Sequence, residues 1–400
     1  MRSQNLRSST LSRRFRTAAV VSLAFIGVMA ATAMGYADNE RSQPDSSRHG
    51  RWAGAVFAMS NSINNQIVSY GRAPDGTLTK LRSQPTGGNG IGVDLDTQGA
   101  LRLSSDHRFL YAANAGSDDI SVFSVDGARL RRIQKIYAGD QPNSLTIHND
   151  LLYVLDGSVA GNGIRGFRVG ENGTLTALPD SFRKLSSPIA VPGQVEFSPD
   201  GNALLVTHKT TNVLMSPQNA IDLFAVGADG IAAMTPTRDA SNGLRPFALA
   251  FRSDGTVAVV ESFNAAPNAS TTSSYRVSAT GQLDVISGSV PNGQTDTCWI
   301  VISKDDQFAF TANFGSGTIS SYRFGSDGAM TLLEGAAAST GDMSEPVDLA
   351  MSADGQNLYM LLRGTGGVAT FRIDGGHLSS LGVVVGSLPV ADGASGLAAY

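Results

Sequence analysis

A strand–turn–strand ending recurs seven times along the chain and constrains its fold more than any other feature. Two of the copies are "ISVFSVDGARL" from Ile120 and "ISSYRFGSDGAM" from Ile319. Asp-Gly or Asn-Gly between alternating apolar residues is the strongest short-range signal of a β-hairpin, because Gly and Asn tolerate positive φ. The turn glycines recur at intervals of 46 to 57 residues: Gly76, Gly127, Gly173, Gly230, Gly281, Gly328 and Gly375.

A second pair of strands precedes most of these endings, as in "VEFSPDGNALLVTH" from Val195 and "IVISKDDQFAFTAN" from Ile300. Each unit of about fifty residues therefore contains four strands, and one such sheet cannot cover both of its apolar faces alone. We predict an all-β fold, a seven-bladed β-propeller of four-stranded blades over residues 52–400.

The two ends of this region predict how the ring closes. The first copy has only one strand before it, "GAVFAMSN", and the chain ends on "ASGLAAY", which resembles an innermost strand without a partner. Pairing of residues 397–400 with residues 54–61 would complete the first blade. Such a closure leaves no exposed sheet edge inside the ring.

The N-terminal residues 1–37 are typical of an export signal. Five arginines precede the apolar stretch "AAVVSLAFIGVMAA", and "GYA" offers small residues for cleavage. The apolar stretch is too short to favour a membrane anchor, so we predict a secreted or periplasmic protein with a disordered lead-in over residues 38–51. We expect no membrane association after cleavage.

Charge and cysteine content exclude several classes of function. Loss of the five arginines takes the formal charge from −4 to −9, and an acidic chain without a basic stripe is a poor partner for nucleic acid. The single cysteine, Cys298, excludes an internal disulfide framework and a cysteine-built zinc site. No metal-ligand spacing occurs, so we predict no metal and no cofactor, and we expect a monomer.

Loop lengths indicate which face of the propeller is functional. The short first and third turns of every blade share one face, here called the plain face. The second turns and the blade-to-blade connections share the other, the long-loop face, and the long segments 80–98, 209–219 and 262–272 all belong to it. Long loops on a rigid scaffold are where binding usually occurs.

Polar residues end the second strand of six of the seven blades on this face. The strand-final residues are Asn61, Asn114, Asp156, His208, Glu261, Asn313 and Leu362, with Arg363 beside the last. One interpretation is that they bond to loop backbone and terminate the strands. The other is that Glu261 and His208 act as general base and acid at a shared channel mouth. An oxygen-lined ring could also hold a cation, although nothing in the sequence requires one.

The repeat as a whole resembles the lactonase-type seven-bladed propellers, the family containing bacterial 6-phosphogluconolactonase and fungal carboxymuconate cyclase. The resemblance extends from about Trp52 to the end, and "PTGGNG", "QGAL" and "CW" are closer to secreted relatives. It implies a pocket lined by basic residues at the start of innermost strands, with a Glu that Glu261 matches. Gly193, Gln194, Phe247 and Ala248 stand where the family's basic residues are expected. Arg245 lies two residues away.

The resemblance implies a secreted lactonase-like enzyme that hydrolyses or forms a small lactone of the sugar-acid type. Glu261 would then act as base, His208 as its acid–base partner, and Arg245 would stabilise the oxyanion. The predicted substrate-binding residues are Asn61, Gln98, Asn114, Asp156, Gln194, Trp299, Asn313 and Arg363.

A second function stays open: a noncatalytic propeller that binds a carbohydrate, a surface polymer or a protein through the long-loop face. In that case Trp299, which begins an innermost strand, would be a stacking platform for a sugar. The alternative for Trp299 is packing between blades six and seven.

Overall fold

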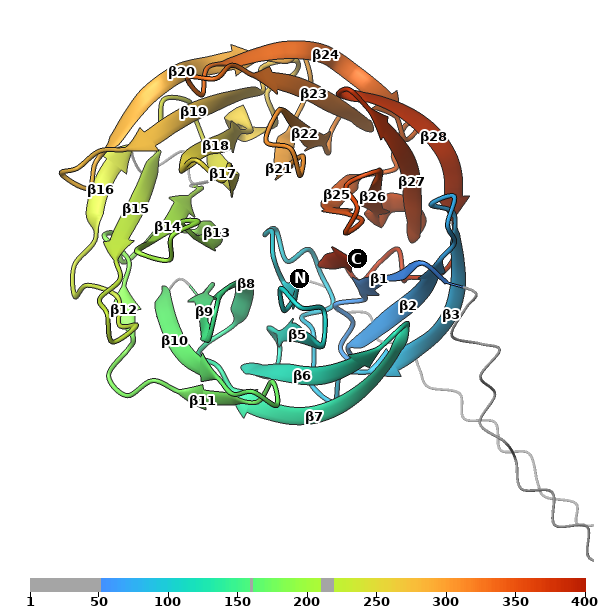
Figure 1. Ribbon diagram of the computed structural model, residues 1–400, viewed down its shortest axis with the longest axis horizontal. Coiled ribbons are helices and arrows are strands. Elements are labelled where there is room, and N and C mark those ends of the chain that lie inside the picture. Colours follow the sequence, from blue (N-terminus) through green and yellow to red (C-terminus); the bar gives the residue numbers. More distant parts are fainter. Residues whose placement is uncertain (1–51, 159–160, 210–218) are drawn as a thin grey trace, which may run out of the picture. The chain divides into compact units, whose positions relative to one another are not determined.

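The structure is a computed structural model that describes residues 52–158, 161–209 and 219–400. These residues form seven antiparallel sheets around a common centre, the blades of a β-propeller, as Figure 1 shows. The predicted fold class is therefore confirmed. The predicted export signal and lead-in, residues 1–37 and 38–51, lie outside the described residues.

Each blade begins at the centre of the ring and proceeds outwards. The innermost strands are β4 (Leu101–Leu103), β8 (Pro142–His148), β13 (Pro192–Phe197), β17 (Pro246–Phe251), β21 (Thr297–Ile302), β25 (Pro346–Met351) and β29 (Leu397–Ala399). The second strands are β1 (Gly54–Met59), β5 (Phe109–Asn114), β9 (Leu151–Asp156), β14 (Ala203–His208), β18 (Thr256–Glu261), β22 (Phe308–Asn313) and β26 (Asn357–Leu362).

The two outer positions of the blades follow the same order. The third strands are β2 (Gln66–Arg72), β6 (Asp119–Asp126), β10 (Gly163–Val169), β15 (Ala220–Ala225), β19 (Thr271–Val277), β23 (Thr318–Phe324) and β27 (Gly367–Asp374). The outermost strands are β3 (Leu78–Pro85), β7 (Arg129–Tyr137), β16 (Thr237–Ala240), β20 (Leu283–Pro291), β24 (Met330–Ser339) and β28 (His377–Val384). In the third blade the outer position is split between β11 (Leu175–Ala177) and β12 (Arg183–Lys184), which both pair with β10. Two short 3₁₀ turns, Phe263–Ala265 and Arg363–Thr365, follow β18 and β26.

The hairpin glycines adopt the conformation that their sequence context predicts. All seven have positive φ, from 55° at Gly127 to 94° at Gly76. Their carbonyls also link neighbouring blades, because tyrosine hydroxyls of second strands donate to them: Tyr111 to Gly173, Tyr153 to Gly230 and Tyr359 to Gly76. The last of these bonds joins the seventh blade to the first.

The ring closes through the C-terminal strand, as predicted. Strand β29 pairs antiparallel with β1, with Val56 opposite Ala399 and Ala58 opposite Leu397. The Arg72 guanidinium reinforces the closure by donating from Nε to the Tyr400 carbonyl at 3.1 Å. Figure 1 shows β29 at the centre of the ring beside β1.

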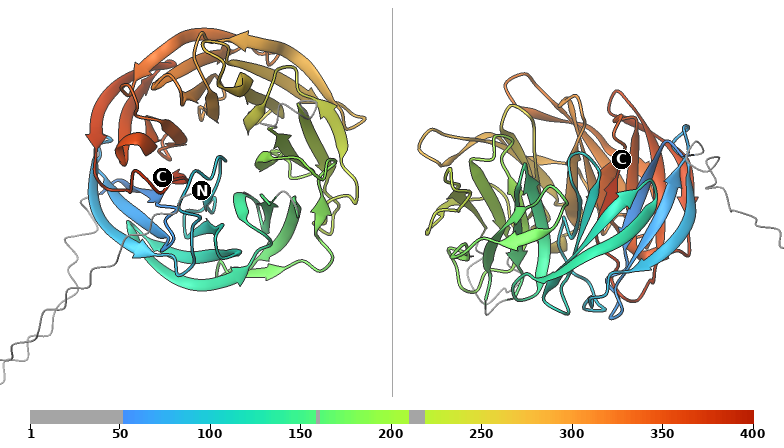
Figure 2. Two further views of the ribbon diagram at one scale, coloured as in Figure 1. Left: turned by 180° about the vertical axis from the view of Figure 1, so that it is seen from behind. Right: turned by 60° about the horizontal axis from the view of Figure 1, so that its bottom comes forward.

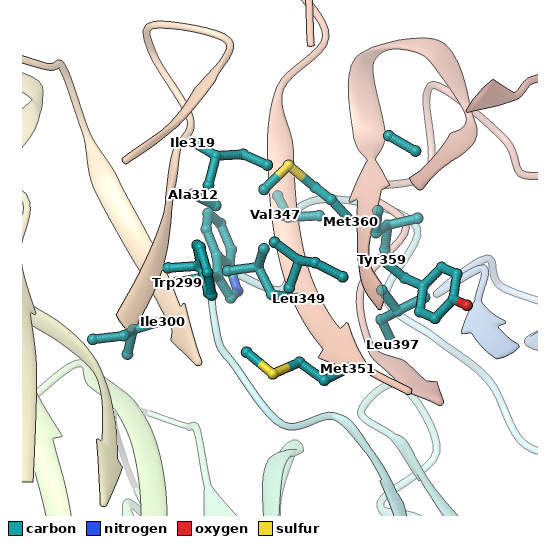
Figure 3. Packing of buried hydrophobic residues seen from close by; sticks show 14 of the residues in the cluster. Trp299, Ile300, Ala312, Ile319, Val347, Leu349, Met351, Tyr359, Met360 and Leu397 are labelled. Atoms are coloured by element: carbon teal, nitrogen blue, oxygen red, sulfur yellow. The ribbon is translucent and has the colours of Figure 1, made fainter. Parts of the chain in front are cut away.

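Apolar side chains fill the spaces between blades. Every residue of β1 is buried, whereas the outermost strand β3 is mostly exposed. The largest cluster of buried residues joins blades five, six, seven and one, and Figure 3 shows a part of it around Trp299, Leu349 and Met360. Such face-to-face burial is what obliges the blades to assemble.

The innermost strands are irregular where they begin. Strands β8, β13, β17, β21 and β25 each shift register within their first four residues, as in the step from Pro246 to Leu249. Bulges of this kind redirect side chains and often lie next to functional sites. These starts lie on the long-loop face, where the second strands end; Figure 2 gives a tilted view of the ring.

Candidate functional site

His208 and Lys209, at the end of β14, have side chains that point in different directions. His208 is the last residue of the strand, and its Nε2 lies 2.9 Å from the carboxylate of Asp222 on the adjacent β15. The same carboxylate accepts bonds from the backbone and the hydroxyl of Ser186. His208 is fully buried. Its contacts are therefore with its own blade, and its neighbour Lys209 contacts the centre of the ring.

Glu261 is likewise a buried group within its blade. Its carboxylate accepts hydrogen bonds from the Gly243 N–H at 2.9 Å, the Ser273 hydroxyl at 2.6 Å and the Ser289 hydroxyl at 3.0 Å. The Thr271 hydroxyl donates to it as well. With no exposed surface and several donors around it, Glu261 lacks the access to a channel mouth that the sequence predicted. The donors anchor the loops of the blade, and the catalytic role of Glu261 stays a prediction.

Asn114 and Asn313 end their strands and Asn61 lies two residues after β1, and all three make the loop contacts that the first interpretation expects. Asn61 donates to the carbonyls of Val93 and Gly393, Asn114 to Asp119 and Ser121, and Asn313 to Thr318 and Ser320. All three are buried. Their side-chain amides already donate hydrogen bonds to other residues of the chain. In this structure they are therefore not free to bind a substrate through those amides.

The connection from the first to the second blade reaches the centre of the ring. Residues 94–98 of this connection are here called the plug segment. They contact β13 and β21, the innermost strands of blades across the ring. Figure 1 shows the connection inside the ring. The side chain of Gln98 donates to the Ile300 carbonyl at 3.0 Å and accepts from the Ile300 N–H at 2.9 Å. The hydroxyl of Thr97 donates to the Gly193 carbonyl at 2.5 Å. Gln98, predicted to bind substrate, is thus an anchor for this segment.

Two cations meet on Asp96 of the plug segment. The ammonium of Lys209 lies 2.5 Å from the Asp96 carboxylate, and the guanidinium of Arg245 lies 3.3 Å from the same oxygen. Both cations lie over the ring of Phe247, at 4.5 Å and 5.5 Å from its centroid. Burial lowers the pKa of Lys209, and the Asp96 carboxylate opposes that effect. Arg245 was predicted from the sequence, whereas Lys209 and Asp96 were not.

Further acids complete this charged cluster. Asp296 lies 3.2 Å from Arg245 and accepts a bond from the Cys298 thiol at 3.3 Å. Burial raises the pKa of Asp296, while Arg245 lowers it in part. Burial also raises the pKa of Cys298, which keeps its thiol protonated. The basic pair of Lys209 and Arg245 thus faces two carboxyl groups, Asp96 and Asp296, at the mouth of the channel.

A second ion pair fixes the other end of the plug segment. Arg363 contacts the carboxylate of Asp94 and lies 2.9 Å from that of Glu345. Its guanidinium lies over Phe314 at 4.5 Å. Arg363, predicted as a substrate-binding residue, therefore holds the plug segment in this structure.

Two further residues predicted to bind substrate, Trp299 and Gln194, have buried side chains. Trp299 is 2 % exposed, and its indole donates to the Thr97 carbonyl, so it offers no platform for a sugar. Figure 3 shows it packed among Ala312, Ile319 and Leu349. Gln194 is fully buried and accepts from the Leu249 N–H. Both side chains support the innermost strands.

Asp156 is the remaining predicted residue, and it differs from the asparagines. One of its carboxylate oxygens has no hydrogen-bond partner among the described residues. Burial raises its pKa to about 7, with Arg165 opposing the shift. It is therefore a carboxyl that changes protonation near neutral pH inside the third blade.

A cavity of about 620 Å³ lies in the channel behind the plug segment. Gln98 and Gly99 line one end of it, and the first-turn residues Ser104, His107 and Lys304 line the other. It therefore extends towards the plain face, and the plug segment separates it from the charged cluster. Its walls carry the ion pair of Arg102 with Glu196 and the buried carboxyl of Asp348.

The described residues contain no group of three or more His, Cys, Asp or Glu side chains placed to hold a metal ion. None of the helices that they form is long and apolar enough to cross a membrane.

The fold and this charged mouth define a seven-bladed propeller with its candidate site on the long-loop face. The family described as "Lactonase, 7-bladed beta-propeller" matches residues 42–192 and 232–348, more than half of the chain. The protein therefore belongs to the lactonase-type seven-bladed propeller family, as the sequence repeat indicated.

Solved structures share the fold at low sequence identity. A Bacteroides fragilis protein provisionally named a 6-phosphogluconolactonase has 18% identity and a TM-score of 0.63, with 86% of this chain and 97% of that chain covered. The periplasmic gluconolactonase of Pseudomonas aeruginosa has 16% identity and a TM-score of 0.61, with 86% and 98% covered. A Lactobacillus plantarum protein has 18% identity and a TM-score of 0.65, with 86% and 98% covered. No curated protein matches the sequence.

Proposed function

We propose that this protein is an exported lactonase-like enzyme that hydrolyses a small lactone of the sugar-acid type at the long-loop mouth of its channel. The carrying observation is that Lys209 and Arg245 converge on one carboxylate there. Membership of the lactonase family and the signal-like residues 1–37 support the proposal. A periplasmic gluconolactonase is among the proteins of similar fold.

The chemistry of lactone opening fits this cluster. Water adds to the ring carbonyl, the carbonyl oxygen becomes an oxyanion, and the ring C–O bond then breaks to give a hydroxy acid. Cations preorganised around the oxyanion usually supply the largest share of catalysis. Arg245 and Lys209 would stabilise the oxyanion, and Asp296, 3.2 Å from Arg245, would take the proton from water and pass it to the ring oxygen as the C–O bond breaks. In this assignment Glu261 and His208 position loops, and Arg245 keeps the role that the sequence suggested.

The test is hydrolysis of glucono-1,5-lactone followed at constant pH, with the spontaneous rate subtracted. Arg245→Met should lower kcat/KM by about 10²-fold, the usual effect of losing one oxyanion donor. Arg252→Met is a matched control, because Arg252 is similarly buried, pairs with Asp254 at 2.9 Å and lies over Phe324 at 5.1 Å. Equal rates in both variants, or no turnover above the spontaneous rate, would reject the proposal.

One observation favours the noncatalytic alternative. The plug segment occupies the mouth, so the charged cluster is covered in this structure. Saturable binding of the lactone without its consumption would support a binding propeller for a carbohydrate, a polymer or a protein. The same titration, with product measured at each point, separates the two functions.

A further inference from the structure

We propose that Lys209 and Arg245 form a binding site for a carboxylate or a phosphate group, and that Asp96 is its built-in occupant, which an external anion displaces. The proposal deepens the proposed function, because it concerns regulation of the same mouth. Anion binding itself does not depend on turnover. The ligand class would be a small monoanion such as a sugar acid or singly charged inorganic phosphate.

The burial of Lys209 requires an anion at this position. Its side chain is 1% exposed, and among the described residues its acid partner is Asp96. An unpaired ammonium in such surroundings would be strongly destabilising. The Asp96 side chain is 35% exposed, so the position it occupies borders solvent. An anion arriving from solvent can therefore take the same place.

The backbone of Asp96 lies in a local turn, and its carbonyl also accepts a hydrogen bond from Lys209. Asp96 has φ +51°, in the left-handed region that non-glycine residues seldom adopt, and its N–H donates to the Asp94 carboxylate at 2.9 Å. The next residues are anchored independently, since Thr97 and Gln98 bond to β13 and β21. Release of Asp96 thus needs a change in one turn, with the anchors of the plug segment kept.

Arg245 would stay in place when Asp96 leaves. Its other amino group lies 3.0 Å from the Ser262 hydroxyl and 3.2 Å from Asp296, and its guanidinium lies over Phe247. The site is therefore preorganised on one side, which lowers the cost of binding. Asp296 and Asp94 lie close by, and their charge disfavours ligands with more than one negative charge.

The experiment empties the site while keeping the backbone. Asp96→Gly suits a positive φ and removes the carboxylate, and Asp96→Asn keeps the shape of the side chain but not its charge. Titration calorimetry with gluconate and with inorganic phosphate at pH 6 should give at least tenfold tighter binding to Asp96→Gly than to the wild type. In the wild type, only the fraction of molecules from which the Asp96 side chain has left can bind, so the apparent Kd is higher than the intrinsic Kd. In Asp96→Gly every molecule is free to bind, and the intrinsic Kd is measured. Comparison of the two probes identifies the preferred anion.

Controls separate this site from nonspecific charge effects. Asp354→Asn removes the acid 3.4 Å from the buried Arg72 in the first blade, and it should not increase anion binding as Asp96→Asn does. The double variant Asp96→Gly/Lys209→Met should lose the gain. In the wild type, saturating gluconate should speed amide hydrogen exchange at residues 94–96 and leave residues 97–98 unchanged.

The results distinguish this inference from the proposed function. Binding to Asp96→Gly no tighter than to the wild type, or a gain that survives Lys209→Met, overturns the inference. Slower exchange at residues 94–96 with gluconate overturns it too. If Asp96→Gly binds anions tightly but consumes no lactone, only the proposed function fails. If the wild type hydrolyses lactone and Asp96→Gly shows no gain in binding, only the inference fails.

Discussion

The ammonium of Lys209 lies 2.5 Å from the carboxylate of Asp96, a residue 113 positions earlier in the chain. This contact joins the end of β14, the second strand of the fourth blade, to the connection between the first and second blades. It places an internal carboxylate where the family resemblance and the cation pair both point to a substrate. The plug segment therefore covers the cations at the mouth of the channel, and the strength of its contacts can be measured.

The energy of this pair can be obtained from a double-mutant cycle. Asp96→Asn leaves a buried ammonium without a counter-charge, so it should reduce the free energy of unfolding by about 2 kcal/mol. In Lys209→Met the same Asp96 change should cost less, because only the pairing with Arg245 is then lost, giving a coupling energy of about 1–3 kcal/mol. Urea unfolding of the four proteins measures it. The exposed pair of Asp150 with Arg168 is the reference, with an expected coupling below about 1 kcal/mol, and equal values for both cycles would contradict the prediction.

Glu261→Gln should affect stability and not the chemical step. The carboxylate accepts from the Gly243 N–H and from the hydroxyls of Ser273 and Ser289. An amide nitrogen would face these donors, at a cost of about 1–3 kcal/mol. Urea unfolding should show this loss, while kcat for glucono-1,5-lactone per folded molecule stays unchanged. Loss of turnover at unaltered stability would instead give Glu261 the catalytic role predicted from the sequence.

Asp156→Asn should remove a pH dependence of stability. The pKa of Asp156 is raised by burial from an unfolded value of 3.8 to about 7, so the folded state binds the extra proton between those values. The contribution of this group is therefore greatest below pH 4 and is lost as pH rises to 7. Each tenfold change in proton affinity corresponds to about 1.4 kcal/mol of stability. Thermal unfolding from pH 4 to 8 should show a smaller decline for Asp156→Asn than for the wild type, and parallel curves would exclude the effect.

Gly54→Ala should weaken the closure of the ring. A methyl group at Gly54 would lie 2.1 Å from the Tyr400 carbonyl oxygen, a backbone atom of the closing segment. The C-terminal strand would have to move, and we expect Tm to fall by several degrees with faster proteolysis near residues 397–400. Gly161→Ala is the control, since its nearest neighbour is the Ser158 hydroxyl at 3.1 Å. Similar Tm values for the two variants would show that the closure tolerates the methyl group.

The fold could be predicted because its signals are local and repeated. A hairpin turn of this type requires a positive φ at its glycine, which depends on no distant residue. Gly76 and Gly127 have such values. The missing strand in the first blade likewise implied the pairing of β29 with β1. Seven copies of one short-range pattern leave few alternative ways to bury the apolar faces.

The site was harder to predict, because it depends on which side of a strand a residue faces. The sequence indicated His208 and Glu261, whose polar character at a strand end is unusual, but both side chains are buried within their blades. Successive residues of a strand face opposite ways, so Lys209 was the better choice beside His208. A lysine directly after a buried strand was the available signal. Asp96 carried no comparable signal within the long connection.

The number of blades, their four-strand order and the closure of the ring could be read from the amino-acid sequence, since these follow from turn chemistry and from the alternation of apolar residues. The passage of the long connection into the channel, and the meeting of Asp96 with Lys209 and Arg245 there, became visible only in the folded protein. The difference lies in the sequence distance over which each feature is specified. Hairpins are specified by neighbouring residues. The pairing of Asp96, from the connection between the first two blades, with charges beside β14 and β17 exists only after the ring has brought these distant segments together.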